Sequence, residues 1–222
     1  GLDDFERWEL AKYVTSLKTD EERDTRGHGM TMCKNTMPLV ANPMHDWPGL
    51  SKDNRSSRVA TNSQLSSETV KNLKLKWAVG FPQVHSFDGG GQPVSVVGDR
   101  VFIGSLNHWV YSFDTNSGCA HWAFEAEFRI RSNVAVSDGV IVFGDTGANA
   151  YALNAETGKL MWRHKVDYTP TARVNGKVML HDGVAYIPVT NYQEVLNMGG
   201  RTLEFPCCTA RGAVAAYDLH TG

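Results

Sequence analysis

Short stretches of alternating apolar and polar residues, separated by turn residues, occupy the chain from about residue 73 onward. The clearest unit predicts four strands, at residues 133–137, 140–145, 149–154 and 160–166. Gly, Asp and Asn lie between these stretches, as expected where an extended chain reverses direction. The pattern therefore predicts an all-β fold of short strands joined by tight turns.

One turn motif recurs three times in this region. Each copy places an Asp or Asn four positions before a Gly: Asp114 and Gly118, Asn154 and Gly158, and Asp218 and Gly222. The Asp or Asn side chain caps such a turn, and the Gly takes the left-handed conformation. Trp122 and Trp162 follow the first two turns and lie 162 − 122 = 40 residues apart. A single copy would indicate a generic hairpin, whereas three copies at matched offsets indicate a structural repeat.

A second motif gives the size of the repeating unit. Asp99, Asp138 and Asp182 each stand two residues before a Val, at spacings of 138 − 99 = 39 and 182 − 138 = 44 residues. Four-stranded units of ~40 residues are typical of β-propeller blades. A flat β-sandwich is the alternative, but it would not require this recurrence. Residues 73–222 provide only about three blades, so we expect the remaining blades in missing sequence or in a partner polypeptide.

The segments before the blades follow other patterns. Residues 2–17 predict a short amphipathic helix, whose apolar face consists of Leu10, Tyr13, Val14 and Leu17. A charged linker follows the helix, so residues 1–26 form the first expected unit. Residues 27–72 mix Met, Pro and Cys and are expected to form an irregular connector. Residues 73–222 form the expected partial propeller.

Composition narrows the function classes. The chain of 222 residues has 22 Lys and Arg against 24 Asp and Glu, which gives a net charge of −2. Hydrophobic residues make up 41% and charged residues 21%, so global disorder is not expected. The near-neutral balance argues against a broad nucleic-acid surface. No apolar stretch approaches the ~18 residues that a membrane span needs.

Polar residues stand where the innermost strand of each predicted blade begins. Gln92, Arg131 and Asn175 each precede one of the repeated Asp residues by seven positions, and Arg173 stands two residues before Asn175. In a propeller blade, the innermost strand starts on the face where the loop between the second and third strands opens. We therefore expect these groups to converge on one face as a ligand site. Solvated rim charges and simple turn formers are the alternative interpretations.

The same face is expected to carry an unusual cysteine pair. The insertion at residues 191–211 is predicted to join the second and third strands of the last blade, and it contains the adjacent residues Cys207 and Cys208. Neighbouring Cα atoms are ~3.8 Å apart, below the 4.4–6.8 Å of ordinary disulfides, so a bond between them would close a strained ring. Two reduced thiols are the alternative. Cys33 and Cys119 could pair with each other, but we expect both to stay unpaired and buried.

Two motifs resemble a known family. The turn Asn154-Ala-Glu-Thr-Gly158-Lys-Leu-Met-Trp162 resembles the repeat of pyrroloquinoline quinone (PQQ) propellers. Cys207-Cys208-Thr-Ala-Arg211-Gly resembles the cysteine-pair loop of quinoprotein alcohol dehydrogenases. The stretches at residues 73–82 and 181–189 look like the polyvinyl alcohol dehydrogenase-like branch of that family. The resemblance covers about residues 47–222, and the cysteine pair with its Arg is its most specific part.

The resemblance implies an eight-bladed ring, of which this chain holds about three to four blades, with PQQ and Ca²⁺ in the channel. A vicinal disulfide would lie flat against the quinone, and Arg211 would hydrogen-bond its oxygens. The implied cofactor contacts are Cys207, Cys208 and Arg211, with Arg131, Gln92 and Arg173 as further candidates. Glu194 is the candidate calcium ligand, because carboxylate oxygen suits this hard cation.

The family reaction oxidises an alcohol by hydride transfer to the quinone and passes electrons to a cytochrome c. No residue of this chain matches the family's catalytic base. Residues 8–17 resemble the final helix of a class I cytochrome c domain, but no Cys-x-x-Cys-His is present. Haem c is therefore expected only on a missing or separate domain, and the location is expected to be periplasmic or secreted. The alternative function is a PQQ-like propeller scaffold without cofactor, of the outer-membrane assembly type.

Overall fold

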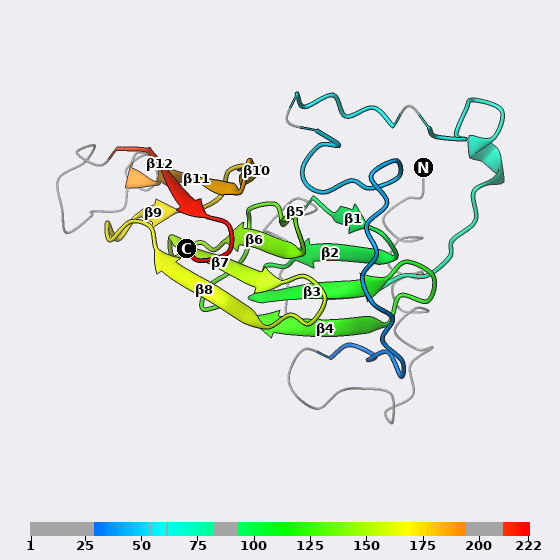
Figure 1. The fold of residues 1–222 in the computed structure, drawn as a ribbon, viewed down its shortest axis with the longest axis horizontal. Helices are drawn as coiled ribbons and strands as arrows, with labels where there is room; N and C mark the ends of the chain where they lie inside the picture. The colour runs from blue at the N-terminus through cyan, green and yellow to red at the C-terminus, as the bar shows by residue number, and fades with distance from the viewer. Residues whose placement is uncertain (1–28, 54, 61, 82–92, 194–210) are drawn as a thin grey trace, which may run out of the picture.

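Three antiparallel sheets follow one another along the chain. The computed structural model describes residues 29–53, 55–60, 62–81, 93–193 and 211–222 (Figure 1). The first sheet has the order β1-β2-β3-β4, with bounds Ser95–Val97, Arg100–Gly104, Trp109–Asp114 and Ala120–Glu125. Each strand pairs with its neighbour in sequence, as in a propeller blade.

The second sheet repeats this topology. Its order is β5-β6-β7-β8, with bounds Ala135–Ser137, Val140–Gly144, Asn149–Asn154 and Leu160–Lys165. These bounds confirm the four strands predicted from the alternating pattern, with ends displaced by at most two residues. Every residue of β6 is buried, because sheets cover both of its faces.

The third sheet has the first three strands of the same arrangement. Its order is β10-β11-β12, with bounds Met179–His181, Val184–Asn191 and Ala213–Asp218. A two-residue strand, β9 (Ala172–Arg173), pairs with the far end of β11. Within the described residues, no strand pairs with the outer edge of β12. The all-β, blade-like architecture is therefore confirmed, while the predicted helix at residues 2–17 lies outside the described residues.

The three predicted turns form as the sequence motif requires. In each one the Asp or Asn side chain accepts two backbone N–H groups and one hydroxyl of the turn; Asp114 Oδ1, for example, accepts from Asn116 N and Ser117 N at 3.1 and 2.7 Å. The closing glycines have φ of +72°, +70° and +87° at Gly118, Gly158 and Gly222. Only Gly enters this region without steric cost, which explains the strict offset.

Neighbouring sheets are joined by a repeated tryptophan contact. Trp122 of β4 donates from Nε1 to Ala155 O at 3.1 Å, and Trp162 of β8 donates to Leu219 O at 3.0 Å. Each indole ring also lies directly against the closing glycine of the next sheet's turn. Each tryptophan therefore belongs to one blade and packs against the turn of the following blade. One such contact occurs per blade, and this explains why the tryptophans recur after 40 residues.

The sheets also pack through their innermost layers. Val174 lies against Gly144 and Ile130 lies against Gly104, at distances that leave no room for a Cβ on either glycine. The apolar cores on the two sides of the second sheet are therefore closely packed. Within the described residues, no helix has the length and apolar character needed to cross a membrane.

The described part of the connector runs along one end of the first sheet. Met32 forms an isolated bridge with Ala120 at the outer strand, whereas Trp47 pairs with Val96 of the innermost strand β1. Pro48 O then accepts the Val136 backbone N–H of β5 at 2.8 Å. The 3₁₀ helix Val70–Asn72 (η2) is its one helical turn within the described residues. The connector thus reaches from the outside of the first blade to the inner strands of two blades.

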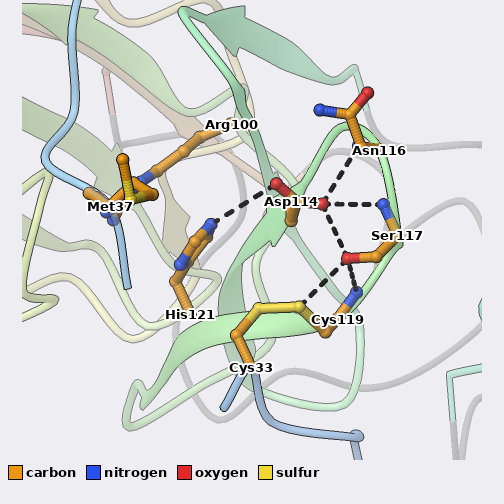
Figure 2. Close-up of a disulfide and its surroundings, with 8 residues drawn as sticks. All are labelled: Cys33, Met37, Arg100, Asp114, Asn116, Ser117, Cys119 and His121. Atoms are coloured by element: carbon orange, nitrogen blue, oxygen red, sulfur yellow. Dashed lines mark hydrogen bonds and ion pairs between the residues drawn. A yellow bond between two sulfur atoms is a disulfide. The ribbon is translucent and has the colours of Figure 1, made fainter. Parts of the chain in front are cut away.

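A disulfide fastens the outer end of this connector to the propeller. Cys33 and Cys119 are bonded, with Cα atoms 5.0 Å apart and 86 residues between them in sequence (Figure 2). Ser117 Oγ donates to Cys119 Sγ at 3.1 Å, so the disulfide sits on the first repeated turn. The expectation that both cysteines stay unpaired is wrong. The expectation relied on the long separation of the two cysteines in sequence, but the connector folds back beside the start of β4 and brings Cys33 to Cys119.

Candidate functional site

The two ends of the sheets differ in what they present. At one end, the turn between the third and fourth strands bonds to the turn between the first and second: Thr115 N donates to Asp99 O, Ala155 N to Gly139 O and Leu219 N to Gly183 O, each at 2.8 Å. The opposite end, here called the loop end, contains the starts of the innermost strands and the connections between second and third strands. This polarity is the one predicted for the ligand site.

Arg131 is held at the loop end by its buried neighbours. Ser132 Oγ accepts from Gly144 N at 2.9 Å and donates to Gly144 O at 3.0 Å, at the end of β6. Asn133 bridges to the next blade, with Nδ2 donating to Val178 O and Oδ1 accepting from Val178 N. These buried bonds fix the backbone on which the exposed Arg131 stands.

Arg173 and Arg211 flank the same end of the third sheet. Arg173 lies on β9, opposite Thr190 of β11, and its Nη1 donates to Pro170 O and Ala172 O at 3.1 and 2.7 Å. Arg211 precedes Gly212, whose backbone lies close to β11: a Cβ added to Gly212 would be 3.2 Å from Val189 O. Because Val174 packs on Gly144 beside Ser132, Arg131 and Arg173 share the loop end.

The loop end therefore carries three cationic side chains. Arg131, Arg173 and Arg211 have no ion pair with any carboxylate of the described residues. A guanidinium group offers a planar set of donors that suits carboxylate and quinone oxygens. The described part of this surface can therefore attract a flat anionic ligand.

The structure does not describe four of the predicted site residues. Gln92, Glu194, Cys207 and Cys208 lie outside the described residues. Asn175, by contrast, donates from Nδ2 to Tyr192 Oη at 3.1 Å, which joins the segment before β10 to the residue that follows β11. Among the described residues, no three His, Cys, Asp or Glu side chains gather as a metal site would require.

A buried polar network behind the loop end was not predicted. Asp145 Oδ2 accepts from Asn149 Nδ2 and Tyr151 Oη, both at 2.8 Å, and Oδ1 accepts two backbone N–H groups. Burial, and then the Asp145 charge, raises the pKa of Tyr151 well above its usual value. The carboxylate is saturated with donors, so this network shapes the connection from β6 to β7 instead of binding a ligand. The sequence alone does not show that the side chains of Asp145, Asn149 and Tyr151 meet, because the pairing of β6 with β7 must be known first.

A cavity of about 310 Å³ lies under the connector, between the innermost strands β5 and β10. Lys52 and Lys177 line it, and the hydroxyl of the buried Ser51 has no hydrogen-bond partner there. Lys52 Nζ donates to Met44 O and Lys177 Nζ to Ser56 Oγ, so both cations contact the connector itself. None of the predicted cofactor residues lines this cavity.

Comparison with known proteins places this chain among PQQ-type propellers. A family model described as "Outer membrane protein assembly factor BamB" matches residues 56–222, three quarters of the chain, so the chain belongs to this family. The chain is a propeller relative of the quinoprotein alcohol dehydrogenases.

Two curated relatives are named polyvinylalcohol dehydrogenase. The one from Pseudomonas sp is 31% identical over 199 residues, which cover 86% of this chain and 30% of that protein. The one from Sphingopyxis sp. (strain 113P3) is 31% identical over 193 residues, covering 83% and 28%. This chain thus spans less than a third of the length of these relatives.

A solved structure confirms the fold. A europium-containing methanol dehydrogenase superposes with a TM-score of 0.66 at 19% identity, covering 82% of this chain and 31% of that one. At this identity the likeness establishes the propeller architecture alone. It agrees with the three successive sheets.

Proposed function

We propose that this chain forms part of a PQQ-dependent alcohol dehydrogenase and holds the quinone at its loop end. What supports the proposal is that Arg131, Arg173 and Arg211 belong to the same end of the sheets and have no carboxylate partners among the described residues. The polyvinylalcohol dehydrogenase relatives supply the reaction class. The substrate proposed for the whole enzyme is accordingly an alcohol.

The donor set of the loop end fits this cofactor. PQQ is a flat quinone that bears several carboxylates, and guanidinium groups are the side chains that bind such oxygens in a defined plane. Arg131 stands on a backbone anchored by Ser132 and Asn133, so its backbone position is fixed before a ligand arrives. Arg211 and Arg173 would orient the opposite side of the ring system.

The remaining cofactor contacts are part of the same proposal. Cys207 and Cys208 would form a vicinal disulfide whose flat side lies against the quinone, and Gln92 would donate to its rim. When bound, PQQ supplies the acceptor for a hydride from the alcohol. The residues of this chain bind it, orient it and exclude water from one side.

The described residues fit a calcium site less well. They contain no cluster of three acidic or imidazole side chains, and Ca²⁺ requires 6–8 oxygen ligands. Glu194 remains a proposed ligand, to be combined with oxygen atoms from other blades. We therefore derive no step of the reaction through the metal ion.

Binding of PQQ to this chain tests the proposal directly. Arg131→Ala and Arg211→Ala should each weaken binding about tenfold, equivalent to roughly 1.4 kcal/mol, as followed by quenching of tryptophan fluorescence. Lys159→Ala removes one exposed positive charge at the opposite end and is the matched control. Equal affinities for all three variants, or no binding by the parent chain, would contradict the proposal.

A second candidate function is a protein-binding scaffold without cofactor. The description of the matching family favours it, since that description names an outer membrane assembly factor. Such a scaffold does not require the disulfide between Cys207 and Cys208. Rapid labelling of both thiols under non-reducing conditions, together with an absence of PQQ binding, would favour the scaffold over the dehydrogenase.

The proposal extends to compartment and electron acceptor. The Cys33–Cys119 disulfide is typical of oxidising compartments, which supports a periplasmic or secreted location. Electrons would leave the reduced quinone for a cytochrome c, carried on a missing or separate domain, and residues 1–26 would be the end of such a domain. Spectra of reduced cytochrome c, recorded with PQQ, Ca²⁺ and alcohol present, would test this transfer in the complete enzyme.

A further inference from the structure

Two neighbouring cavities lie between the connector and the innermost strands. The first, of about 310 Å³, lies between β5 and β10. The second, of about 420 Å³, lies between the connector and the ends of β1 and β5. Four residues line both of them: Pro48, Lys52, Val136 and Ser137. The cavities therefore share one wall, and Lys52 stands on that wall.

Apolar residues form most of the lining of both cavities. Val97, Val136 and Leu180 come from the innermost strands of the three sheets, while Leu39 and Pro43 come from the connector. Each cavity alone falls within the range of about 300–1,000 Å³ that is typical of small-molecule sites. Walls of this kind suit an aliphatic chain, because apolar surface gains free energy when it leaves water.

Two lysines give the first cavity positive charge. Lys52 Nζ donates to Met44 O at 2.7 Å, and Lys177 Nζ donates to Ser56 Oγ at 3.3 Å. An ammonium group has three donors, so each lysine keeps donors for a ligand. Neither lysine forms an ion pair with a carboxylate of the described residues. The first cavity can therefore attract an anionic group.

The carboxylates that line the cavities accept hydrogen bonds from residues next to them. In the first cavity, Asp53 accepts from the backbone N–H groups of Arg55 and Ser57 and from the Ser57 hydroxyl. In the second, Asp46 accepts from two backbone N–H groups at 2.7 Å, and Asp138 accepts from a neighbouring hydroxyl at 2.9 Å. Positive charge thus prevails in the first cavity only, which favours an anion there and disfavours one in the second.

A buried serine of the connector adds a further donor. Ser51 lines the first cavity and is only 4% exposed, and its hydroxyl has no hydrogen-bond partner within the described residues. A buried hydroxyl that lacks a partner lowers stability, so an acceptor supplied by a ligand would be favourable there. The serine and the two lysines therefore form one donor set at the first cavity.

We propose that these two cavities bind a medium-chain aliphatic carboxylate. Its carboxylate group lies in the first cavity and accepts from Lys52, Lys177 and Ser51. Its alkyl chain follows the shared apolar wall into the second cavity. The inference goes beyond the proposed function and does not depend on PQQ, because neither Arg131 nor the other two loop-end arginines line these cavities.

Titration calorimetry with three compounds tests the chemical class of the ligand. Octanoate has both the charge and the alkyl chain, acetate has only the charge, and 1-octanol has only the chain. The protein should bind octanoate at least tenfold more tightly than either of the others, because each of them lacks one half of the interaction. An absence of octanoate binding would overturn the proposal, and so would equal affinity for acetate or for 1-octanol.

Substitution of the two lysines tests the position of the carboxylate. Lys52→Met and Lys177→Met should each weaken octanoate binding about tenfold, because methionine keeps an unbranched apolar side chain but removes the charge. Lys71→Met is the matched control, at an exposed lysine of η2, and should bind octanoate as the parent does. Equal affinities in all three variants would contradict the assignment of the anion to the first cavity.

Ser51→Ala separates a binding role from a structural one. Since the hydroxyl has no partner within the described residues, its removal should leave the free energy of unfolding unchanged or raise it, while octanoate binding weakens several-fold. Octanoate binding that Ser51→Ala leaves unchanged would remove this serine from the proposed site. Arg131→Ala should bind octanoate as the parent does, so failure of this proposal and failure of PQQ binding are distinguishable.

Discussion

At the scale of single residues, each tryptophan contact depends on a glycine that has no room for a side chain. A Cβ added to Gly158 would lie 2.6–2.8 Å from three atoms of the Trp122 ring. Gly158 also has a φ of +70°, a region that other residues occupy at a cost of roughly 1–2 kcal/mol. The turn thus selects glycine for two separate physical reasons.

Those two reasons can be separated by a pair of substitutions. Gly158→Ala should lower the free energy of unfolding by roughly 2–4 kcal/mol, because steric overlap adds to the backbone cost. Gly139→Ala should cost only about 1 kcal/mol, since Gly139 has a φ of +74° but nothing within 4 Å of its Cβ position. Equilibrium unfolding in urea measures both, and equal losses would show that the tryptophan yields without cost.

A buried histidine makes stability depend on mildly acidic pH. Burial, and then the charge of Arg100, lowers the pKa of His121 below its ordinary value of 6.5, although Asp114 Oδ2 lies 4.0 Å from its Nε2 (Figure 2). Neither ring nitrogen forms a hydrogen bond within the described residues. In the unfolded chain this histidine takes up a proton below about pH 6.5, but in the folded chain it does so only at lower pH. The stability that its neutral form provides is complete above about pH 6.5 and is lost as the pH falls toward the lower pKa of the folded chain.

Urea unfolding between about pH 7 and 5 tests this linkage. The parent chain should lose stability over the interval, and His121→Gln should show a smaller slope because the substitute does not titrate. His220→Gln alters an exposed histidine in the third turn and is the control. A slope that His121→Gln leaves unchanged would assign the pH dependence to other groups.

At the scale of elements, the connector is a long segment with little regular structure. A buried arginine and a disulfide hold it against the sheets. Arg100, fully buried, donates to Met37 O of the connector at 2.8 Å and to Glu156 O of the second sheet's turn at 2.6 Å. The Cys33–Cys119 disulfide covalently fixes the outer end. One cation and one disulfide thus join a segment without strands to two blades.

Loss of this disulfide should be costly because it closes a long loop. With a separation of 86 residues, the Cys33→Ser/Cys119→Ser double variant should lose roughly 2–5 kcal/mol of unfolding free energy under oxidising conditions. Reductant should then cause no comparable further loss in the double variant, whereas it should destabilise the parent. Thermal unfolding of both proteins with and without reductant provides the measurement, and a parent that ignores reductant would refute the expectation.

At the scale of the whole molecule, the described blades form an open arc whose middle sheet is the best covered. β6 is buried at every position and β7 at five of six, because sheets lie on both sides of them. Among the described residues, nothing covers the outer edge of β12 or most of its surface. Stability should therefore fall along the arc from the second sheet to the third.

Hydrogen exchange of this chain should reveal this gradient. Amides of β6 and β7 should exchange most slowly, and those of β12 considerably faster, since local opening of β12 exposes little additional apolar surface. Equal protection of β7 and β12 would mean that the arc unfolds as one cooperative unit.

The sequence by itself determined the repeating unit. Alternation located β5 to β8 within two residues, and the Asp-to-Gly offset identified turns whose capping bonds and positive φ values the structure confirms. These features are local, since a turn needs only its own side chain and its own glycine. The polarity that places Arg131 and Arg173 at one end also follows from strand order.

Only the tertiary structure decided which distant segments meet. It brought Cys33 to Cys119, paired Trp47 with Val96 and buried the network around Asp145. It also placed Trp77 on the first turn, where its Nε1 donates to Thr115 O. Contacts of this kind depend on how the connector folds back over the sheets. Their free energy comes from surfaces far apart in sequence, which local periodicity does not encode.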